Sequence, residues 1–207
     1  MRKVCCFALA IYAVIGLAGS AGAQDLADAR SRADLTKAVQ TCVLCHGPNG
    51  RSVSPTFPNL AAQSAEYLKV QLKAFKDESR SDPDAQAFMW GMAAQLNDSL
   101  TDQLADYFSK QAPAPGHSGD AALIAKGKII FETGVPTRQI PPCATCHGAQ
   151  AQGFASFPRL AGQHAPYLLK QLLVIQNALR SAPVMHGIVK DLTKDQIQAV
   201  ATYLESI

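Results

Sequence analysis

The sequence predicts an all-α protein built from two tandem domains of similar length. Three observations carry this prediction. Apolar residues recur at helical spacing, no segment shows the alternation of a β-strand, and the second half of the chain repeats the first. The repeat includes Phe57-Pro58-Asn59-Leu60-Ala61 and Phe157-Pro158-Arg159-Leu160-Ala161. Two units of about 85 residues indicate duplication of one module, because a solenoid needs more and shorter repeats.

The first 23 residues are similar to an export signal. Arg2 and Lys3 form a charged start, an apolar run extends from about Val4 to Leu17, and Ala21-Gly22-Ala23 matches a small-residue cleavage site. The run is shorter than the roughly 20 residues that cross a bilayer, and no later segment is apolar enough to do so. We therefore expect residues 1–23 to be cleaved and the mature chain to be exported to a bacterial periplasm.

A proline- and glycine-rich stretch at 111–120 predicts a linker between a first domain at 24–110 and a second domain at 121–207. Each domain is predicted to end in an amphipathic helix, and the apolar faces contain Leu100, Leu104, Tyr107 and Phe108 in one and Ile197, Val200, Ala201 and Leu204 in the other. Thr193 and Gln196 form a capping box that opens the last helix. Middle helices are expected to begin near Ser64 and near Pro166.

Charge is nearly balanced in the predicted mature chain. Residues 24–110 carry 11 acidic and 9 basic side chains, and residues 111–207 carry 5 acidic and 8 basic side chains. The resulting net charges of −2 and +3 give no reason to expect nucleic acid as a partner. The asymmetry suggests that the two domains orient towards different protein partners, and chance is the simpler explanation of so small a difference.

Two copies of Cys-x-x-Cys-His are the most informative motifs, at Cys42-Val-Leu-Cys45-His46 and Cys143-Ala-Thr-Cys146-His147. This pentapeptide is the attachment site of c-type haem. The two thiols reach the two vinyl groups of one porphyrin, and the adjacent imidazole becomes the proximal iron ligand. Two such motifs predict two covalently bound haems. The four cysteines of the mature chain all lie in these motifs, because Cys5 and Cys6 belong to the predicted signal.

Structural zinc and dithiol redox chemistry use the same residue types. In zinc sites the histidine usually lies several residues from the cysteines, because an adjacent histidine does not easily close the same tetrahedron. A thioredoxin-like pair is expected in a βαβ pattern, which this sequence lacks. Both alternatives are therefore weaker than haem.

A six-coordinate haem needs a second axial ligand. Met89 and Met185 occupy equivalent positions in the repeat, each seven residues before a leucine on the predicted loop into the terminal helix. We therefore assign them as the distal iron ligands. Met92 is the rival of Met89 in the first domain, but its counterpart in the second domain is Ile188, which cannot bind iron.

Other side chains near these motifs receive weaker assignments. We expect His117 to be solvated in the linker, His164 to cap a helix, and His186 to pack or lie at the surface rather than replace Met185. The backbone carbonyls of Pro58 and Pro158 are candidates to accept a hydrogen bond from the proximal histidines. Arg138 and Arg159 are candidates to pair with haem propionates, and exposed surface charge is an equal alternative.

On these motifs, on the segment 134–142 and on both methionines, the chain resembles cytochrome c4, a family of dihaem proteins with two class I cytochrome c folds. The resemblance covers the mature sequence. It implies His/Met ligation at both irons and an electron-transfer role between a quinol-oxidising complex and a terminal oxidase, and it leaves peripheral membrane association open. Two departures are the absence of a glycine matching Gly127 in the first domain and a loop before Met89 that is four residues longer.

The alternatives belong to other functional classes. The chain is a cytochrome subunit of a larger dehydrogenase if the catalytic chemistry resides in a partner. It is a dihaem peroxidase if one iron loses its sixth ligand and becomes reactive. Such peroxidases are typically longer, and the equivalence of Met89 and Met185 gives no sign of one special haem. We therefore expect a carrier and not an enzyme.

Overall fold

A computed structural model describes residues 16–207. The first half of the chain forms α1 (Gly16–His46), η1 (Pro48–Gly50), α2 (Ala65–Lys76), the π-helical turn η2 (Ala85–Met89), α3 (Trp90–Ala94) and α4 (Asp98–Ser109). The second half forms α5 (Ala121–Thr133), η3 (Pro136–Arg138), α6 (Ala144–His147), α7 (Ala165–Gln176), α8 (Pro183–Val189) and α9 (Lys194–Glu205). Over these residues there are two isolated β-bridges and no strand, so the all-α prediction is confirmed.

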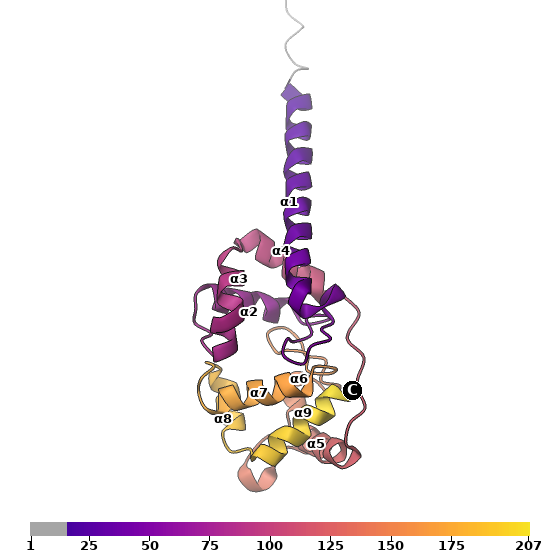
Figure 1. Cartoon of the computed structure of the whole chain (residues 1–207), viewed down its shortest axis with the longest axis vertical. Helices are drawn as coiled ribbons and strands as arrows, with labels where there is room; N and C mark the ends of the chain where they lie inside the picture. Colours follow the sequence, from indigo (N-terminus) through magenta and orange to yellow (C-terminus); the bar gives the residue numbers. More distant parts are fainter. Residues whose placement is uncertain (1–15) are drawn as a thin grey trace, which may run out of the picture.

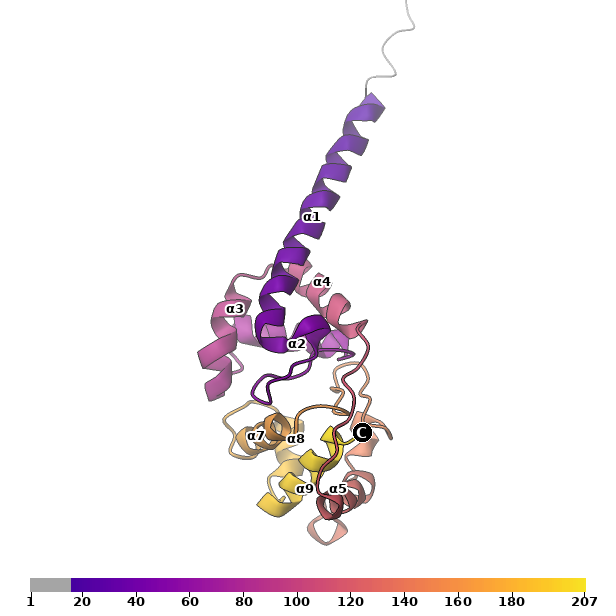
Figure 2. The same ribbon diagram turned by 45° about the vertical axis from the view of Figure 1, so that its right-hand side comes forward.

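The two halves form two helical bodies stacked along the long axis of the molecule (Figure 1). Helices α2 to α4 surround the inner end of α1 in the first body, and α5 to α9 form the second. The outer part of α1 projects beyond the first body, as Figure 2 also shows. Within the described residues, no helix combines the length and hydropathy needed to cross a membrane.

The predicted export signal falls largely outside the described residues. Its charged start and most of its apolar run lie before residue 16. The predicted cleavage site at 21–23 lies within α1, which is continuous in the uncleaved chain. The contacts of α1 with the first domain come later, at Ser31, whose Oγ donates to Gln103 Oε1 at 3.1 Å, and at Leu35 and Val39 in the core.

The helix starts that the sequence predicts are confirmed by the structure. Ser64 is the N-cap of α2, and its Oγ accepts from the backbone N–H of Tyr67. Thr193 and Gln196 form both hydrogen bonds of the predicted capping box at the start of α9. The middle helix of the second domain begins at Ala165. These ends depend on residues three or four positions apart, which is why sequence alone predicts them.

The hydrophobic cores differ between the domains. The second domain has one large cluster, which includes Phe131, Leu168, Ile197 and Leu204. The first domain has two smaller clusters, one around Leu68, Leu104 and Phe108 and the other around Phe75, Ala85 and Ala93. Two small domains of this size gain considerable apolar burial from a bound porphyrin.

The first and last helices also pack differently in the two domains. In the second domain α5 lies so close to α9 that a Cβ at Gly127 would be 2.0 Å from the carbonyl oxygen of Ala199. In the first domain α1 has no glycine at the corresponding segment and runs as one long helix directly into the first Cys-x-x-Cys-His motif. In the second domain a loop and η3 separate α5 from that motif.

The linker is fixed against the domains it connects. The Arg51 Nε donates to the carbonyl of Ala112 at 2.8 Å, and the backbone N–H of His117 donates to the carbonyl of Glu205 at 2.9 Å. Gly116 leaves no room for a Cβ, which would be 2.5 Å from the carbonyl oxygen of Ser206. The polypeptide between the domains therefore follows the C-terminal end of α9.

Candidate haem sites

The first Cys-x-x-Cys-His motif forms the last turns of α1. Because Cys42 and Cys45 are three residues apart in a helix, both thiols project from one side of it. Cys45 is exposed, Cys42 is partly buried and His46 is buried with 7 % of its surface accessible. Both cysteines are free thiols. The arrangement presents two sulfur atoms to the same side while the imidazole lies inside the domain.

The second motif is built on a separate short helix. Cys143 occupies the N-cap position of α6, and Cys146 and His147 lie in its single turn. Burial raises the pKa of the Cys143 thiol to about 11 and also raises the pKa of Cys42. A thiol held in its neutral form is a poor zinc ligand and a poor redox nucleophile. Among residues 16–207, no three His, Cys, Asp or Glu side chains converge as a metal site.

Both motif histidines are held in the tautomer that iron requires. The Nδ1 of His46 lies 2.9 Å from the carbonyl oxygen of Pro58, and the Nδ1 of His147 lies 2.9 Å from that of Pro158. A carbonyl only accepts, so Nδ1 carries the proton and the lone pair of Nε2 is free. The predicted role of the two prolyl carbonyls is therefore observed.

The imidazoles are also kept neutral. Burial lowers the pKa of His46 and of His147, against a smaller opposing effect of the prolyl carbonyls. The Nε2 of His147 is buried and has no hydrogen-bond partner in the described structure. A buried nitrogen lone pair without a donor is costly unless another group binds it. The residues present therefore fit a haem whose iron is bound at Nε2.

The repeated Phe-Pro-x-Leu-Ala segment orients the motif histidine in each domain. Phe57 lies edge-on to the ring of His46 with centroids 6.1 Å apart, and Phe157 lies edge-on to His147 at 6.4 Å. The next residue is the proline whose carbonyl accepts the Nδ1 proton. Two adjacent residues thus fix both the tilt and the tautomer of each imidazole.

The candidate methionines lie in short helices and not on loops, so that part of the prediction was wrong. Met89 ends the turn η2 and is partly buried against Phe75, Ala85 and Ala93. Met185 lies in α8, which opens with Pro183, and packs against the main cluster of the second domain. Met92 lies in α3 with 54 % of its surface exposed. The structure therefore directs Met89 inward and Met92 outward.

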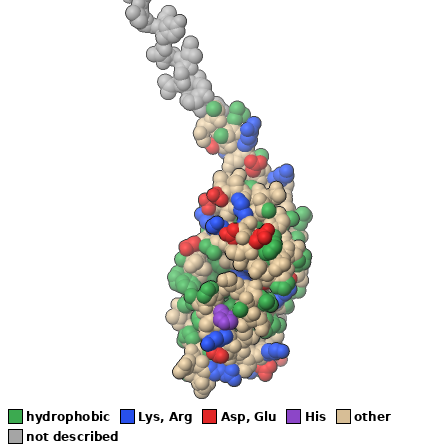
Figure 3. Space-filling model, turned by 90° about the vertical axis from the view of Figure 1, so that its left-hand side faces the viewer, with side chains coloured by type: hydrophobic (Ala, Val, Ile, Leu, Met, Phe, Trp, Pro, Cys, Tyr) green, Lys and Arg blue, Asp and Glu red, His purple; other side chains and the backbone are tan. Residues whose placement is uncertain are grey.

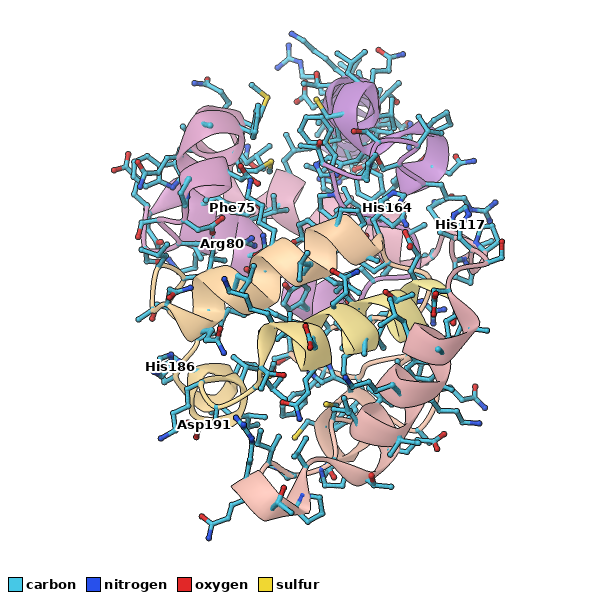
Figure 4. All side chains as sticks on the ribbon, turned by 60° about the horizontal axis from the view of Figure 1, so that its bottom comes forward. Phe75, Arg80, His117, His164, His186 and Asp191 are labelled. Atoms are coloured by element: carbon cyan, nitrogen blue, oxygen red, sulfur yellow. The ribbon has the colours of Figure 1, made fainter. Side chains whose placement is uncertain are left out.

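His164 was predicted to cap α7, and this was wrong. It is the N-cap residue, but its side chain makes no capping bond. Its Nε2 instead donates to the carbonyl of Ser52 in the first domain at 2.9 Å, and its Nδ1 lies 3.7 Å from Glu205. His117 is exposed as predicted but stacks on His164 with centroids 6.4 Å apart, and the two lie close together in Figure 4. Contact with the first domain therefore sets the position of the His164 side chain, and His117 lies against His164.

The remaining assignments concern His186 and two arginines. The Nδ1 of His186 donates to the carbonyl of Ile175 at 2.9 Å, as expected of a packing residue. Arg138 is exposed and donates to the carbonyl of Asp191 at 2.7 Å. Arg159 is half-buried, and burial lowers its pKa. Neither arginine is paired with a carboxylate in the described structure.

The family model for cytochrome c matches residues 33–111 and 124–207. Cytochrome c-552 of Acidithiobacillus ferridurans is 44 % identical over 168 residues, which are 80 % of this chain and 73 % of that protein. Cytochrome c4 of Pseudomonas aeruginosa is 32 % identical over 213 residues and is matched over 100 % of both chains. The chain belongs to the cytochrome c4 family.

The solved structure of cytochrome c4 from Acidithiobacillus ferrooxidans matches with a TM-score of 0.77 at 42 % identity, over 80 % of this chain and 98 % of that chain. A thiosulfate dehydrogenase electron acceptor of Thiomonas intermedia is 38 % identical over 90 residues, which are 44 % of this chain and 41 % of that protein. The predicted pair of class I cytochrome c domains and the two c-type haems are thereby confirmed, and the chain is an electron-transfer cytochrome.

The two domains of this cytochrome c4 are joined by reciprocal hydrogen bonds. The side-chain amide of Gln163 accepts from the backbone N–H of Asn59 at 2.8 Å and donates to its carbonyl at 3.0 Å. Gln63 makes the same pair of bonds to Arg159, at 2.7 and 3.0 Å. The glutamine of each domain thus contacts the Phe-Pro-x-Leu-Ala segment of the other. The two glutamines occupy equivalent positions, 100 residues apart, in the two halves of the chain.

One group at this interface was missed by sequence analysis. Arg80 and Arg180 are 100 residues apart, the same offset that relates Gln71 to Gln171, and both arginines are buried with 8 % of their surface exposed. That shared offset was the available signal. Their position between the domains depends on how the two repeats face each other, which periodicity alone does not show.

Proposed function

We propose that this cytochrome c4 is a dihaem electron carrier of the bacterial periplasm, which passes electrons from respiratory-chain donors such as a quinol-oxidising complex to a terminal oxidase. The observation that carries the proposal is the equivalence of the two sites. Each has a histidine with Nδ1 2.9 Å from a prolyl carbonyl, and each has a partly buried methionine at the same place in the repeat. The two sites do not differ from each other in a way that would leave one iron without a distal ligand and therefore reactive.

We assign the haem-binding residues as follows. Cys42 and Cys45 form the thioethers of the first haem, and Cys143 and Cys146 form those of the second. His46 and His147 are the proximal ligands, and Met89 and Met185 are the distal ligands. The haem iron supplies the one-electron chemistry. The protein holds each imidazole neutral and oriented, and a thioether sulfur stabilises ferrous over ferric iron and so raises the reduction potential. With a histidine and a methionine bound to each iron, no substrate would have access to it.

Export is part of this proposal. Cleavage near Ala23 would leave a shortened α1 that begins near Gln24. The contacts of α1 with the first domain begin at Ser31 and continue through Leu35 and Val39 to the haem motif, so all of them remain. Haem attachment and partner exchange would then take place in the periplasm.

A protein surface suited to redox partners supports the carrier role. Hydrophobic side chains gather on the face that carries α3 and α8 (Figure 3). Exposed residues of these two helices include Met92 at 54 % and Val184 at 70 %. Both helices follow or contain a proposed distal ligand, so a partner docked here would lie near both haems. The opposite net charges of the domains would help to orient different partners.

A second candidate is the electron acceptor of a dehydrogenase. The similarity to a thiosulfate dehydrogenase electron acceptor over 90 residues favours it. In this case the chain still carries electrons and the substrate chemistry belongs to the partner. The two candidates therefore share the haem sites and differ in the electron donor.

An anaerobic reductive titration of the purified haem-loaded protein tests the carrier proposal. We expect uptake of two electrons per chain, with no binding of carbon monoxide to the reduced protein and no turnover of hydrogen peroxide. Carbon monoxide binding or peroxide turnover would contradict the carrier and favour the peroxidase-type alternative. Comparing reduction by a quinol-oxidising membrane fraction with reduction by a thiosulfate dehydrogenase and its substrate then distinguishes the two donors.

A further inference from the structure

Each proposed distal methionine lies in a short helical segment that is tied to the end of a middle helix. Met185 belongs to α8, and Met89 stands at the junction of η2 and α3. The middle helices α7 and α2 end at Gln176 and Lys76. These two residues are 100 positions apart, as are the other equivalent residues of the middle helices. The same helix end therefore faces the methionine segment in both domains.

In the second domain the tie is the side-chain amide of Gln176. Its Nε2 lies 2.9 Å from the carbonyl oxygens of both Val189 and Leu192. A third carbonyl, that of Lys190, lies at 3.2 Å. All three neighbours are carbonyls, which only accept, so the amide nitrogen faces them. Carbonyls at the C-terminal end of a helix have no partner within that helix, and Gln176 supplies one at the end of α8.

In the first domain the equivalent bond comes from Lys76, whose Nζ donates to the carbonyl of Leu96. Leu96 and Leu192 each follow the distal methionine by seven residues. The acceptor is therefore the same in both domains, although the donor is a lysine in one and a glutamine in the other. Lys76 is exposed and makes this one contact to the segment in the described structure, whereas Gln176 is partly buried and makes three.

The residue after each methionine makes a second tie. The Nδ1 of His186 donates to the carbonyl of Ile175 at 2.9 Å, and Figure 4 shows His186 beside the end of α7. The indole N–H of Trp90 donates to the carbonyl of Arg80 at 2.8 Å. Ile175 lies in the last turn of α7, but Arg80 lies in the loop that follows α2. The second tie of the first domain is thus anchored to a loop and not to a helix.

Apolar packing behind the two methionines differs in the same direction. Met185 packs against the large core cluster of the second domain, which also contains Val189 of α8. Met89 packs against the small cluster around Phe75, which is separate from the main cluster of the first domain. A segment with few buried apolar contacts and exposed hydrogen bonds opens locally at a lower cost in free energy. The methionine segment of the first domain has both properties.

We propose that Gln176 and Lys76 are positioning residues that clamp the distal methionines onto the haem irons, and that the clamp is weaker in the first domain. This inference rests on the axial ligands of the proposed function. A methionine sulfur leaves iron more easily when its helical segment can move away, and the clamp opposes that movement. Met89 should therefore leave the first iron more often than Met185 leaves the second.

Imidazole binding to the oxidised haem-loaded protein, followed by stopped-flow spectroscopy, measures how often each methionine leaves. The iron–sulfur bond breaks first and an iron–nitrogen bond then forms, with no change in the oxidation state of iron. In the wild type we expect two kinetic phases of one haem each, with the faster phase at the first haem. Met89→Ala and Met185→Ala assign the phases, since each variant leaves one haem already open.

In Gln176→Ala the slower phase should accelerate by about two- to tenfold for each hydrogen bond lost, while the phase of the first haem stays unchanged. Lys76→Ala should accelerate only the phase of the first haem, and by a smaller factor, because one exposed bond is lost. Gln176→Lys is the conservative variant, since it gives the second domain the donor that the first domain uses. It should restore part of the difference between Gln176→Ala and the wild type.

Asn177→Ala is the matched control. The Nδ2 of Asn177 donates to the carbonyl of Leu173 at 2.8 Å, within its own helix. The variant therefore loses an amide-to-carbonyl bond next to Gln176 without loosening α8, and neither phase should change. The Tm of every variant is recorded as well. A role of Gln176 in global stability alone would lower the Tm and leave the imidazole rates as in the wild type, which would contradict the clamp.

The sulfur-to-iron charge-transfer band of the wild type is measured first, because it tests the ligands separately from the clamp. Fewer than two equivalents would overturn the ligand assignment and the clamp together. Two equivalents, with equal imidazole rates in Gln176→Ala and the wild type, would overturn the clamp and leave the proposed function standing. A slower phase at the first haem than at the second would overturn the predicted order of the two domains.

Discussion

Met89→Ala is expected to remove about half of the sulfur-to-iron charge-transfer absorbance of the oxidised protein, because one of two thioether ligands is lost. The first haem then has an open distal position. We expect its reduction potential to fall strongly, since a thioether stabilises ferrous iron, and we expect the reduced protein to bind one carbon monoxide per chain. Optical spectra and redox titration of the purified variant measure all three effects.

Met92→Ala is the matched control for this prediction. Met92 is three residues from Met89 but 54 % exposed, so its truncation should leave the charge-transfer band and both potentials unchanged. If Met92→Ala loses the band and Met89→Ala keeps it, the ligand assignment in the first domain is wrong. Met185→Ala should reproduce the effect of Met89→Ala at the second haem, because the two methionines occupy equivalent places in the repeat.

Gly127→Ala is expected to destabilise the second domain severely. The added Cβ would lie 2.0 Å from the carbonyl oxygen of Ala199 and 2.7 Å from the Cβ of Tyr203. The first of these contacts is with backbone, so it can be relieved only by moving α5 away from α9. Overpacking of this kind typically costs about 1–3 kcal/mol or more, which exceeds the roughly 1 kcal/mol that alanine gains over glycine in a helix.

Thermal unfolding of the haem-loaded variant measures this loss. At ~2–4 °C per kcal/mol for a chain of this length, we expect a Tm lower by several degrees. Lys126→Ala, at the neighbouring exposed position of α5, should change the Tm by much less. An unchanged or higher Tm for Gly127→Ala would show that α5 and α9 are not packed as closely as described.

The features that sequence analysis predicted correctly depend on short stretches of chain. The haem motifs are local because both thiols and the imidazole lie within five residues. The caps at Ser64 and Thr193 are local for the same reason. The prolyl carbonyls that accept from His46 and His147 were also found, because a repeated proline follows each motif at nearly the same distance.

The features that were missed depend on contact between the domains. His164 has the position of a helix cap, but a carbonyl of the first domain competes for its ring nitrogen. Arg80 and Arg180 show nothing unusual in their own segments, and their burial follows only from the way α2 and α7 face each other. The arginines that were predicted as candidates instead were Arg138 and Arg159, with exposed surface charge as an equal alternative. Arg138 is exposed and donates to the carbonyl of Asp191. Pairings across 100 residues are set by tertiary structure and leave no local pattern.

The optical spectrum of the oxidised mature protein tests the central claim most directly, through the intensity of the sulfur-to-iron charge-transfer band per haem. A carrier with His46 and Met89 at one iron and His147 and Met185 at the other predicts two equivalents of this band and no carbon monoxide binding after reduction. One equivalent or none, together with ready binding of carbon monoxide or peroxide, would mean an open iron and would contradict the carrier.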